Sequence, residues 1–158
     1  MALISPADQR RLQESFGEMT RGVRLIFFTQ AIGCETCPQT RQILDELPPL
    51  SDKISIEEIN LILDGDKARQ YGIDRAPAIA VTYADGSAAS TPDASIDTSS
   101  WKDSRIRFLG APAGYEFISL VQAILVAGGV GTGLGEASLA RLALLDKPVT
   151  MQVFTTPT

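Results

Sequence analysis

The chain contains two cysteines, and they lie three residues apart in the stretch GCETCPQT at residues 33–40. Cys34 and Cys37 could act as a redox dithiol, supply half of a metal site, or serve as two small buried apolar side chains. Dithiol exchange needs one thiolate that attacks a disulfide and a second thiol that resolves the mixed disulfide. A two-residue spacer at the start of a helix meets both needs, because free backbone N–H groups there favour the first thiolate.

The residues around the cysteines favour the redox interpretation. Glu35, Thr36 and Pro38 are typical of an exposed turn, which argues against two inert buried thiols. A mononuclear zinc site needs four nitrogen or sulfur ligands, and a chain with two cysteines and no histidine cannot supply them. Metal binding would therefore require two chains that share a site. For the single chain we predict no metal, and no cofactor beyond the redox-active Cys34–Cys37 disulfide.

The composition of the chain limits its partners. With 158 residues the chain fits a single globular domain, and its net charge of −5 leaves no basic face for nucleic acid. The first sixteen residues carry an aspartate and two arginines where the apolar core of a secretory signal would lie. We therefore expect a cytoplasmic protein that does not bind nucleic acid.

Short apolar runs and helical patterns must position the cysteines. The order of the expected elements predicts an α/β protein with a central mixed four-stranded sheet flanked by helices. The expected elements are a helix from Ser5-Pro6, a strand at 23–28, a helix behind the cysteines at 39–47, a strand at 54–63, a short helix at 67–71, a strand at 78–83, an exposed insertion at 87–104, a strand at 105–109 and a long helix to about residue 127.

An uncharged stretch at residues 117–135 has almost the length that a membrane-spanning helix requires. Three polar side chains interrupt it, and glycines crowd its second half. A buried helix that ends at the first glycines fits this pattern better, so we expect no membrane span.

Three segments carry a resemblance to a known family. FFT-x4-CETC, YGIDRAPAIAV and RFLGAPAGYEF resemble the glutaredoxin-like protein disulfide oxidoreductases of the thioredoxin superfamily, which consist of two tandem thioredoxin-type units. The resemblance covers most of residues 20–127. It implies a thioredoxin-like fold, with Cys34 as the attacking thiol and Cys37 as the resolving one. It also implies that Pro77 is a cis-proline facing them, with backbone groups of Ala76 directed at the substrate.

Other residues near the cysteines are expected to bind substrate or to tune the cysteine pKa. Thr36 belongs to this set, and Glu35 would oppose a thiolate nearby. Arg75 could favour the thiolate, although a solvated arginine or a partner of a carboxylate fits the sequence equally well. Pro77 could instead be an ordinary trans proline of a loop. Phe28 marks a departure from thioredoxins, which carry at this position an acid that helps to deprotonate the resolving cysteine.

The end of the chain echoes its beginning. MQVFT at residues 151–155 is similar to LIFFT at residues 25–29, and a helical pattern precedes each. We therefore expect a first domain at 1–130, followed at 131–158 by a linker and the start of a second unit. That start would comprise a helix at 136–145 and a strand at 149–154. A strand without its own sheet favours pairing with another chain, so a homodimer through 149–154 is possible.

The predicted function is thiol–disulfide exchange with disulfide-containing proteins, with electrons from a donor resembling thioredoxin reductase. The alternative is a non-catalytic thioredoxin-fold module that docks within a two-unit protein or a peroxide-reducing flavoprotein system. The first units of such flavoproteins generally lack CxxC. Because this chain keeps it, the enzyme is the favoured reading.

Overall fold

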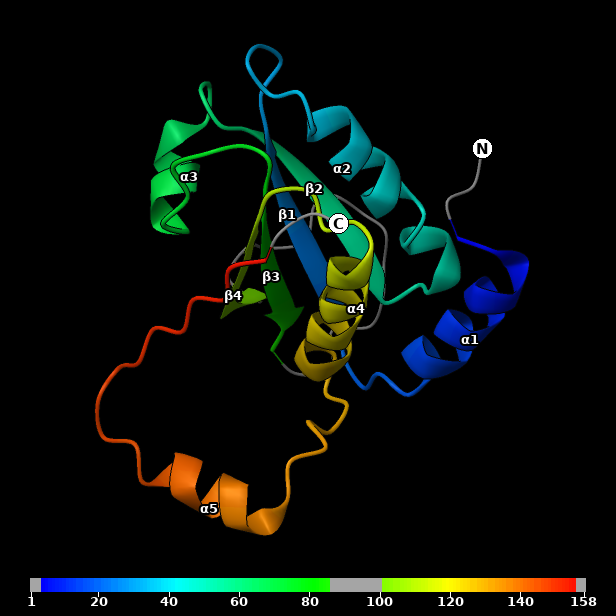
Figure 1. The fold of residues 1–158 in the computed structure, drawn as a ribbon, viewed down its shortest axis with the longest axis vertical. Helices are drawn as coiled ribbons and strands as arrows, with labels where there is room; N and C mark the ends of the chain where they lie inside the picture. The colour runs from blue at the N-terminus through cyan, green and yellow to red at the C-terminus, as the bar shows by residue number, and fades with distance from the viewer. Residues whose placement is uncertain (1–3, 86–100, 156–158) are drawn as a thin grey trace.

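The computed structural model of the protein describes residues 4–85 and 101–155, which form one four-stranded sheet with helices on both sides (Figure 1). The helices are α1 (Pro6–Gly17), α2 (Cys37–Asp45), the 3-10 helix η1 (Pro48–Leu50), α3 (Gly65–Gln70), α4 (Tyr115–Ala127) and α5 (Glu136–Ala143). The strands are β1 (Val23–Thr29), β2 (Ile54–Asn60), β3 (Ala78–Ala84) and β4 (Trp101–Leu109).

The sheet has the strand order β2-β1-β3-β4. β1 and β2 are parallel, whereas β3 is antiparallel to both of its neighbours, β1 and β4. The predicted α/β fold with a mixed four-stranded sheet is therefore confirmed. The helix α2 connects β1 to β2, which gives the crossover that two parallel strands require.

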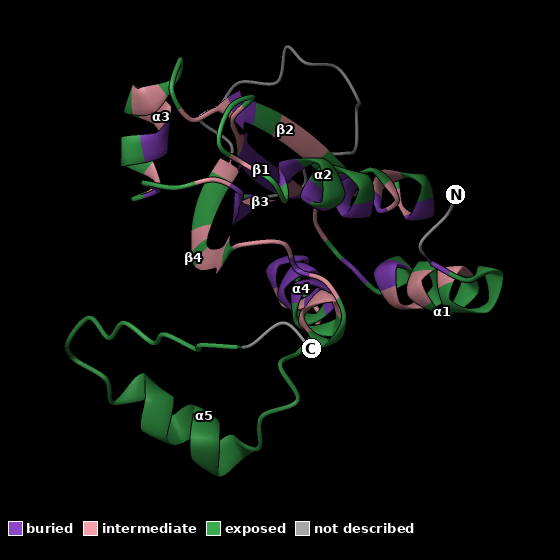
Figure 2. Cartoon of the chain, turned by 45° about the horizontal axis from the view of Figure 1, so that its top comes forward, coloured by how far each residue is buried: buried purple, intermediate pink, exposed green. Residues whose placement is uncertain are grey.

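The two faces of the sheet pack against different helices (Figure 2). Alternate side chains of β1 point to opposite faces, as the period of a strand requires. Leu25 and Phe27 belong to a core shared with α1, α2 and α4, while Ile26 and Phe28 belong to a smaller core shared with α3. All four side chains are at most 2% exposed, so β1 is buried on both faces as its apolar run predicts.

The long helix α4 ends at glycines, as its sequence predicts. Gly129 takes a positive φ of 92°, and the N–H groups of Gly129 and Val130 donate to the carbonyls of Val126 and Leu125. This is the Schellman arrangement of a helix C-terminus. The carbonyl of Gly128 then accepts from Thr20 N–H at 2.8 Å, which fastens this end to the segment between α1 and β1. No helix within residues 4–85 and 101–155 is long and apolar enough to cross a membrane.

Two predicted boundaries are wrong. The strand expected at 54–63 ends at Asn60, because the Asn60 side chain accepts hydrogen bonds from Ile62 N–H and Leu63 N–H and turns the chain. The last strand begins at Trp101 rather than at Arg105, so residues 101–104 belong to the sheet. The rest of the predicted insertion, residues 87–100, lies outside the described residues.

The strand β4 is irregular in its middle. Its register against β3 shifts between Val81 and Thr82, and Arg105 has a positive φ of 64°. Asp103 stabilises the bulge by accepting from Arg105 N–H at 2.8 Å and from the guanidinium of Arg107 at 2.6 and 2.8 Å. This edge of the sheet is therefore kinked, whereas β2 at the other edge pairs with β1 without interruption over seven residues.

The C-terminal segment lies apart from the rest of the fold (Figures 1 and 2). The helix expected at 136–145 is present as α5 at Glu136–Ala143, and all of its residues are exposed. The strand expected at 149–154 is absent, because residues 149–155 find no ladder partner in the described chain. The second unit itself remains a prediction.

Candidate active site

The cysteines lie at one edge of the sheet, where the ends of all four strands meet. Thr29 at the end of β1 pairs with Asn60 at the end of β2, and Ala78 at the start of β3 pairs with Leu109 at the end of β4. Because Phe28 pairs with Ala78, these four ends are in line. The loop that follows β1 at this edge leads into the N-terminus of α2.

A tight turn carries the chain from β1 into α2. Gln30 closes the start of the turn by donating from its side chain to the carbonyl of Ile32 at 2.9 Å, and Gly33 has a positive φ of 77°. The carbonyl of Thr36 accepts from both the N–H and the hydroxyl of Thr40, each at 2.9 Å. Thr36 is therefore the N-cap residue of α2 through its backbone, and its side chain makes no capping hydrogen bond.

Cys34 and Cys37 are joined by a disulfide, with their Cα atoms 5.4 Å apart. Cys37 is the first residue of α2 and is 5% exposed, as part of the core under the helix. Cys34 precedes the helix, is partly exposed and packs against the edge of the same core. The structure thus brings the two predicted cysteines together, with Cys34 partly exposed and Cys37 buried.

The predicted cis-proline is present at the same edge. The peptide bond between Ala76 and Pro77 is cis. The carbonyl of Pro77 accepts from Gly110 N–H at 2.9 Å, which ties the start of β3 to the loop after β4. Ala76 packs against the same core as Cys34.

Arg75 and Glu35, the charged residues predicted to tune the Cys34 thiolate, do not form an ion pair with each other. Arg75 forms two hydrogen bonds to its neighbour Asp74, at 2.7 and 3.1 Å, so its guanidinium serves a carboxylate. This hydrogen bonding lowers the pKa of Asp74 and raises the pKa of Arg75. Glu35 is exposed in the turn between the cysteines and forms no ion pair with any described residue. The local Asp74–Arg75 pair could have been found from the sequence, because the two residues are adjacent.

The expected departure at Phe28 takes a different form in the structure. Phe28 is fully buried in the core shared with α3, on the face of the sheet away from Cys37. The β1 residues that share a core with Cys37 are Val23, Leu25 and Phe27. Among residues 4–85 and 101–155 the buried polar side chains are Thr40 and Thr82, so no described carboxylate is buried in the place of the missing acid.

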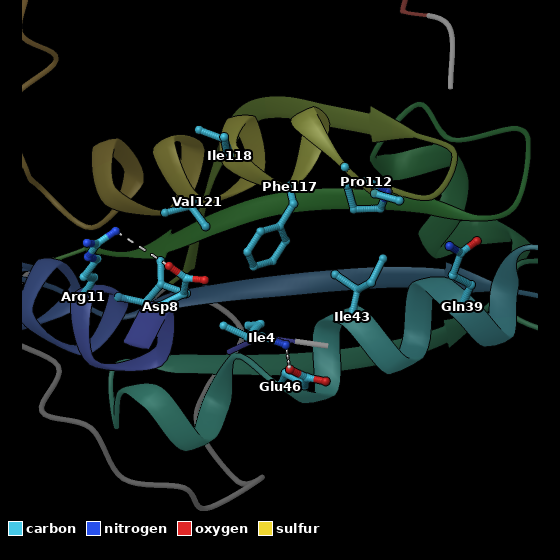
Figure 3. Close-up of a pocket in the computed structure, with 13 residues that line it drawn as sticks. Ile4, Asp8, Arg11, Gln39, Ile43, Glu46, Pro112, Phe117, Ile118 and Val121 are labelled. Atoms are coloured by element: carbon cyan, nitrogen blue, oxygen red, sulfur yellow. Dashed lines mark hydrogen bonds and ion pairs between the residues drawn. The ribbon is translucent and has the colours of Figure 1, made fainter. Parts of the chain in front are cut away.

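A cavity of about 600 Å³ opens beside the first turn of α2, between α1, α2 and α4 (Figure 3). Phe117 and Ile43 point into it from opposite sides, and Gln39 lies at the end nearest the cysteines. Asp8 and Arg11, which form an ion pair at 3.9 Å, lie at the far end. The cavity is mainly apolar, and it runs alongside the helix that carries Cys37. Sequence reasoning did not identify it, because its lining comes from three separate helices.

Within residues 4–85 and 101–155, no group of three or more cysteine, aspartate or glutamate side chains could hold a metal ion. The bonded pair Cys34–Cys37 lies at the same edge as the cis peptide bond before Pro77.

No family model matches the chain. A probable thioredoxin from Methanothermobacter marburgensis is 37% identical over 60 residues, which represent 37% of this chain and 69% of that protein. The chain belongs to the thioredoxin family. A second probable thioredoxin, from Methanothermobacter thermautotrophicus, is 39% identical over 49 residues, or 30% of this chain and 58% of that protein.

Solved structures extend the similarity of this thioredoxin-family chain to nearly its full length. The NTD_N/C domain of alkylhydroperoxide reductase AhpF from Enterococcus faecalis superposes with a TM-score of 0.72 and 25% identity, over 91% of this chain and 62% of that one. A protein disulfide oxidoreductase from Aeropyrum pernix has the same fold, with a TM-score of 0.66 and 23% identity over 89% of this chain and 55% of that one. This thioredoxin-family chain thus spans 58% and 69% of the length of the two curated relatives, and 62% and 55% of the two solved structures.

Proposed function

We propose that this chain is a thiol–disulfide oxidoreductase that acts on protein substrates through Cys34 and Cys37. The observation that carries the proposal is the bonded cysteine pair at the start of α2, in a thioredoxin fold, with one sulfur partly exposed and the other buried. The free N–H groups at the start of α2 favour negative charge on a sulfur nearby. The exposed member, Cys34, is the attacking thiol in this proposal.

The reaction transfers two electrons from the dithiol to a substrate disulfide. The Cys34 thiolate attacks one substrate sulfur, forms a mixed disulfide and releases the other substrate sulfur as a thiolate, which takes a proton from water. Cys37 then loses its proton and attacks the Cys34 sulfur. The Cys34–Cys37 disulfide forms, and the second substrate sulfur leaves as a thiolate.

The remaining predicted site residues have supporting roles in this proposal. Ala76, next to the cis-proline Pro77, presents backbone groups to an extended substrate segment that passes Cys34. Glu35 and Thr36 occupy the turn between the cysteines and contact the same segment. Their position in the loops around Cys34 supports these roles.

A reductase that resembles thioredoxin reductase would return two electrons to the disulfide after each turnover. We place the activity in the cytoplasm, where a lone CxxC pair can cycle through its reduced form. We also propose that two copies associate through residues 149–154, whose apolar side chains are exposed in the single chain.

A second candidate function is a docking module of a larger peroxide-reducing protein. The superposition on the AhpF domain favours it, since that domain is part of an alkylhydroperoxide reductase. A module that only docks has no need of a paired dithiol. The intact Cys34–Cys37 pair therefore supports the enzyme more strongly.

Reduction of insulin in the presence of dithiothreitol tests the proposed function. We expect the wild-type chain to accelerate insulin precipitation and Cys34→Ser to have no effect beyond that of dithiothreitol alone. Cys37→Ser should instead accumulate a mixed disulfide with insulin that is visible on a non-reducing gel. A wild-type rate equal to that of Cys34→Ser would refute the enzyme and leave the docking module.

A further inference from the structure

Exposed apolar side chains gather in the loops at the edge of the sheet that carries the cysteines. Ile32 precedes the cysteines and is 88% exposed, while Ile62 and Leu63 follow β2 and are 73% and 82% exposed. Tyr115, at the start of α4, is 83% exposed. Thr29 and Leu61 are joined by a hydrogen bond of 2.8 Å, so the two loops that carry the apolar residues leave the sheet side by side.

Exposed apolar side chains in neighbouring loops can contact the apolar side chains of a bound polypeptide. A separate apolar cavity lies between α2 and α4, with Phe117 and Ile43 directed into it (Figure 3). Gln39 and the loop at 112–114 line its near end, next to the helix that begins with Cys37.

The acidic and basic side chains at this edge differ in whether they form ion pairs. The cations nearest the edge are already engaged with carboxylates: Arg75 with Asp74, Arg69 with Asp66, Lys67 with Glu57 and Arg41 with Glu58. Three carboxylates have no ion-pair partner among residues 4–85 and 101–155: Glu35 between the cysteines, Asp64 after β2 and Glu116 in the first turn of α4.

We infer that the site selects disulfides in cationic polypeptide segments, that is, segments with lysine or arginine beside the disulfide. A substrate segment that crosses Cys34 between the loop after β2 and the start of α4 meets Asp64 on one side, Glu35 in the centre and Glu116 on the other. Lysine or arginine in that segment finds a carboxylate without a competing cation. An acidic segment meets like charge at each of these positions.

This inference rests on the proposed function, and it deepens that function by naming the substrate class. Three exposed charge pairs that each contribute a factor of about two give a preference of about tenfold. Because exposed charges are screened by salt, the preference should shrink as salt is raised.

The test uses two short peptides, each closed into a ring by one disulfide and each with a leucine at the same position. One carries three lysines beside the disulfide, and the other carries three glutamates there. The pre-reduced full chain is mixed with each peptide, and kcat/KM for peptide reduction is measured at low and at high salt. We expect the lysine peptide to react about tenfold faster at low salt, with a smaller ratio at high salt.

The triple variant Glu35→Gln, Asp64→Asn, Glu116→Gln should bring the ratio to within about twofold. Removing Glu35 also changes the charge beside Cys34 and so alters the rate with both peptides, which is why the ratio is the readout. The matched control is Glu14→Gln, Glu18→Gln, Asp52→Asn, which removes three acids at the opposite end of the fold and should preserve the ratio.

The possible results separate this inference from the function on which it rests. Equal rates with the two peptides, or a preference that the triple variant retains, would overturn the charge selection while leaving the oxidoreductase intact. Failure to reduce either peptide or insulin would overturn both.

Discussion

The two cysteines differ because they occupy different places relative to one helix. Cys37 starts the face of α2 that Thr40 and Leu44 continue, and this face is buried against the sheet. Cys34 lies before the helix, in the turn that Gly33 opens with its positive φ. Cys34 is therefore partly exposed, whereas Cys37, three residues further along the chain, is buried.

This difference predicts unequal alkylation in the reduced protein. We expect iodoacetamide at pH 7 to modify Cys34 at least about tenfold faster than Cys37, because thiol reactivity follows access and thiolate character. Mass mapping of the modified peptides measures both rates. In denaturant the two rates should become similar, and faster modification of Cys37 in the native protein would contradict the assigned roles.

Asp103 gives the fold a pH-dependent element of stability. Burial would raise its pKa, but hydrogen bonds from Arg107 and from Arg105 N–H outweigh this effect and lower the pKa below the ordinary value of 3.8. A carboxylate with a lowered folded-state pKa stabilises the protein above its unfolded-state pKa. This contribution is lost as the pH falls through the folded-state pKa.

Asp103→Asn should therefore lower the free energy of unfolding by about 1 kcal/mol at pH 7, a modest value because the side chain is partly exposed. The gap from wild type should narrow below about pH 3.8. Urea unfolding at pH 7 and pH 3 measures it, with Asp146→Asn as an exposed control. A gap that is as large at pH 3 as at pH 7 would exclude this origin.

At the scale of elements, hydrogen bonds join the C-terminus of α4 to the segment that leads into β1. Gly128 and Gly129 end the helix, and the carbonyl of Gly128 accepts from Thr20 and Arg21 N–H. Arg21 also donates from Nε to the carbonyl of Ala127 at 2.7 Å. The entrance to β1 is thus attached to the C-terminus of α4.

A side chain at Gly129 should disturb this attachment. Gly129→Ala would place a Cβ inside contact distance of Thr20 Oγ1, at a residue whose φ of 92° already disfavours side chains. We expect a loss of about 2 kcal/mol in the free energy of unfolding, measured by urea denaturation.

Gly131→Ala is the matched control, because nothing lies within 4 Å of a Cβ at Gly131. Its effect should stay within about 0.5 kcal/mol. If the two alanine variants were equally stable, the glycine requirement at residue 129 would be disproved.

Sequence patterns predicted several elements correctly and missed the boundaries of two strands. The apolar runs of β1 and β3 and the glycines after α4 predicted their elements, because burial on both faces and helix termination leave clear local signals. The end of β2 was missed because its apolar pattern continues past Asn60, whose side chain turns the chain. The start of β4 was missed because residues 101–104 include Lys102, Asp103 and Ser104, which read as a polar loop.

The sequence predicted those features of the site that depend on short segments. The spacing of Cys34 and Cys37 and the resemblance around Pro77 located both parts of the edge. The partner of Arg75 and the face occupied by Phe28 depend on side-chain direction, which a motif does not specify. The cavity beside α2 depends on the packing of three helices, which no short segment encodes.

For the whole molecule, the exposed C-terminal segment bears on association. Val149, Met151, Val153 and Phe154 are between 64% and 89% exposed, a concentration of apolar surface that the described chain does not cover. Val149, Met151 and Val153 alternate along the segment, as they would on one face of a strand.

We expect the wild-type chain to form dimers as its concentration rises, and the double variant Met151→Glu, Val153→Glu to remain monomeric, because charges on this face oppose pairing. Sedimentation velocity over a range of concentrations measures the change. Thr132→Glu adds a negative charge outside the segment and should still dimerise. A wild-type chain that stays monomeric throughout would contradict association through residues 149–154.

The bulge of β4 affects how the sheet can pair with strands of other molecules at high protein concentration. A fibre built by adding strands to sheets needs two open sides on every molecule, one to receive and one to offer. The positive φ at Arg105 and the register shift beside it make β4 irregular, whereas β2 pairs regularly with β1, so we expect an added strand to pair more readily with β2 than with β4. An irregular edge of this kind disfavours repeated strand addition, because such growth needs a regular edge on both sides of every molecule.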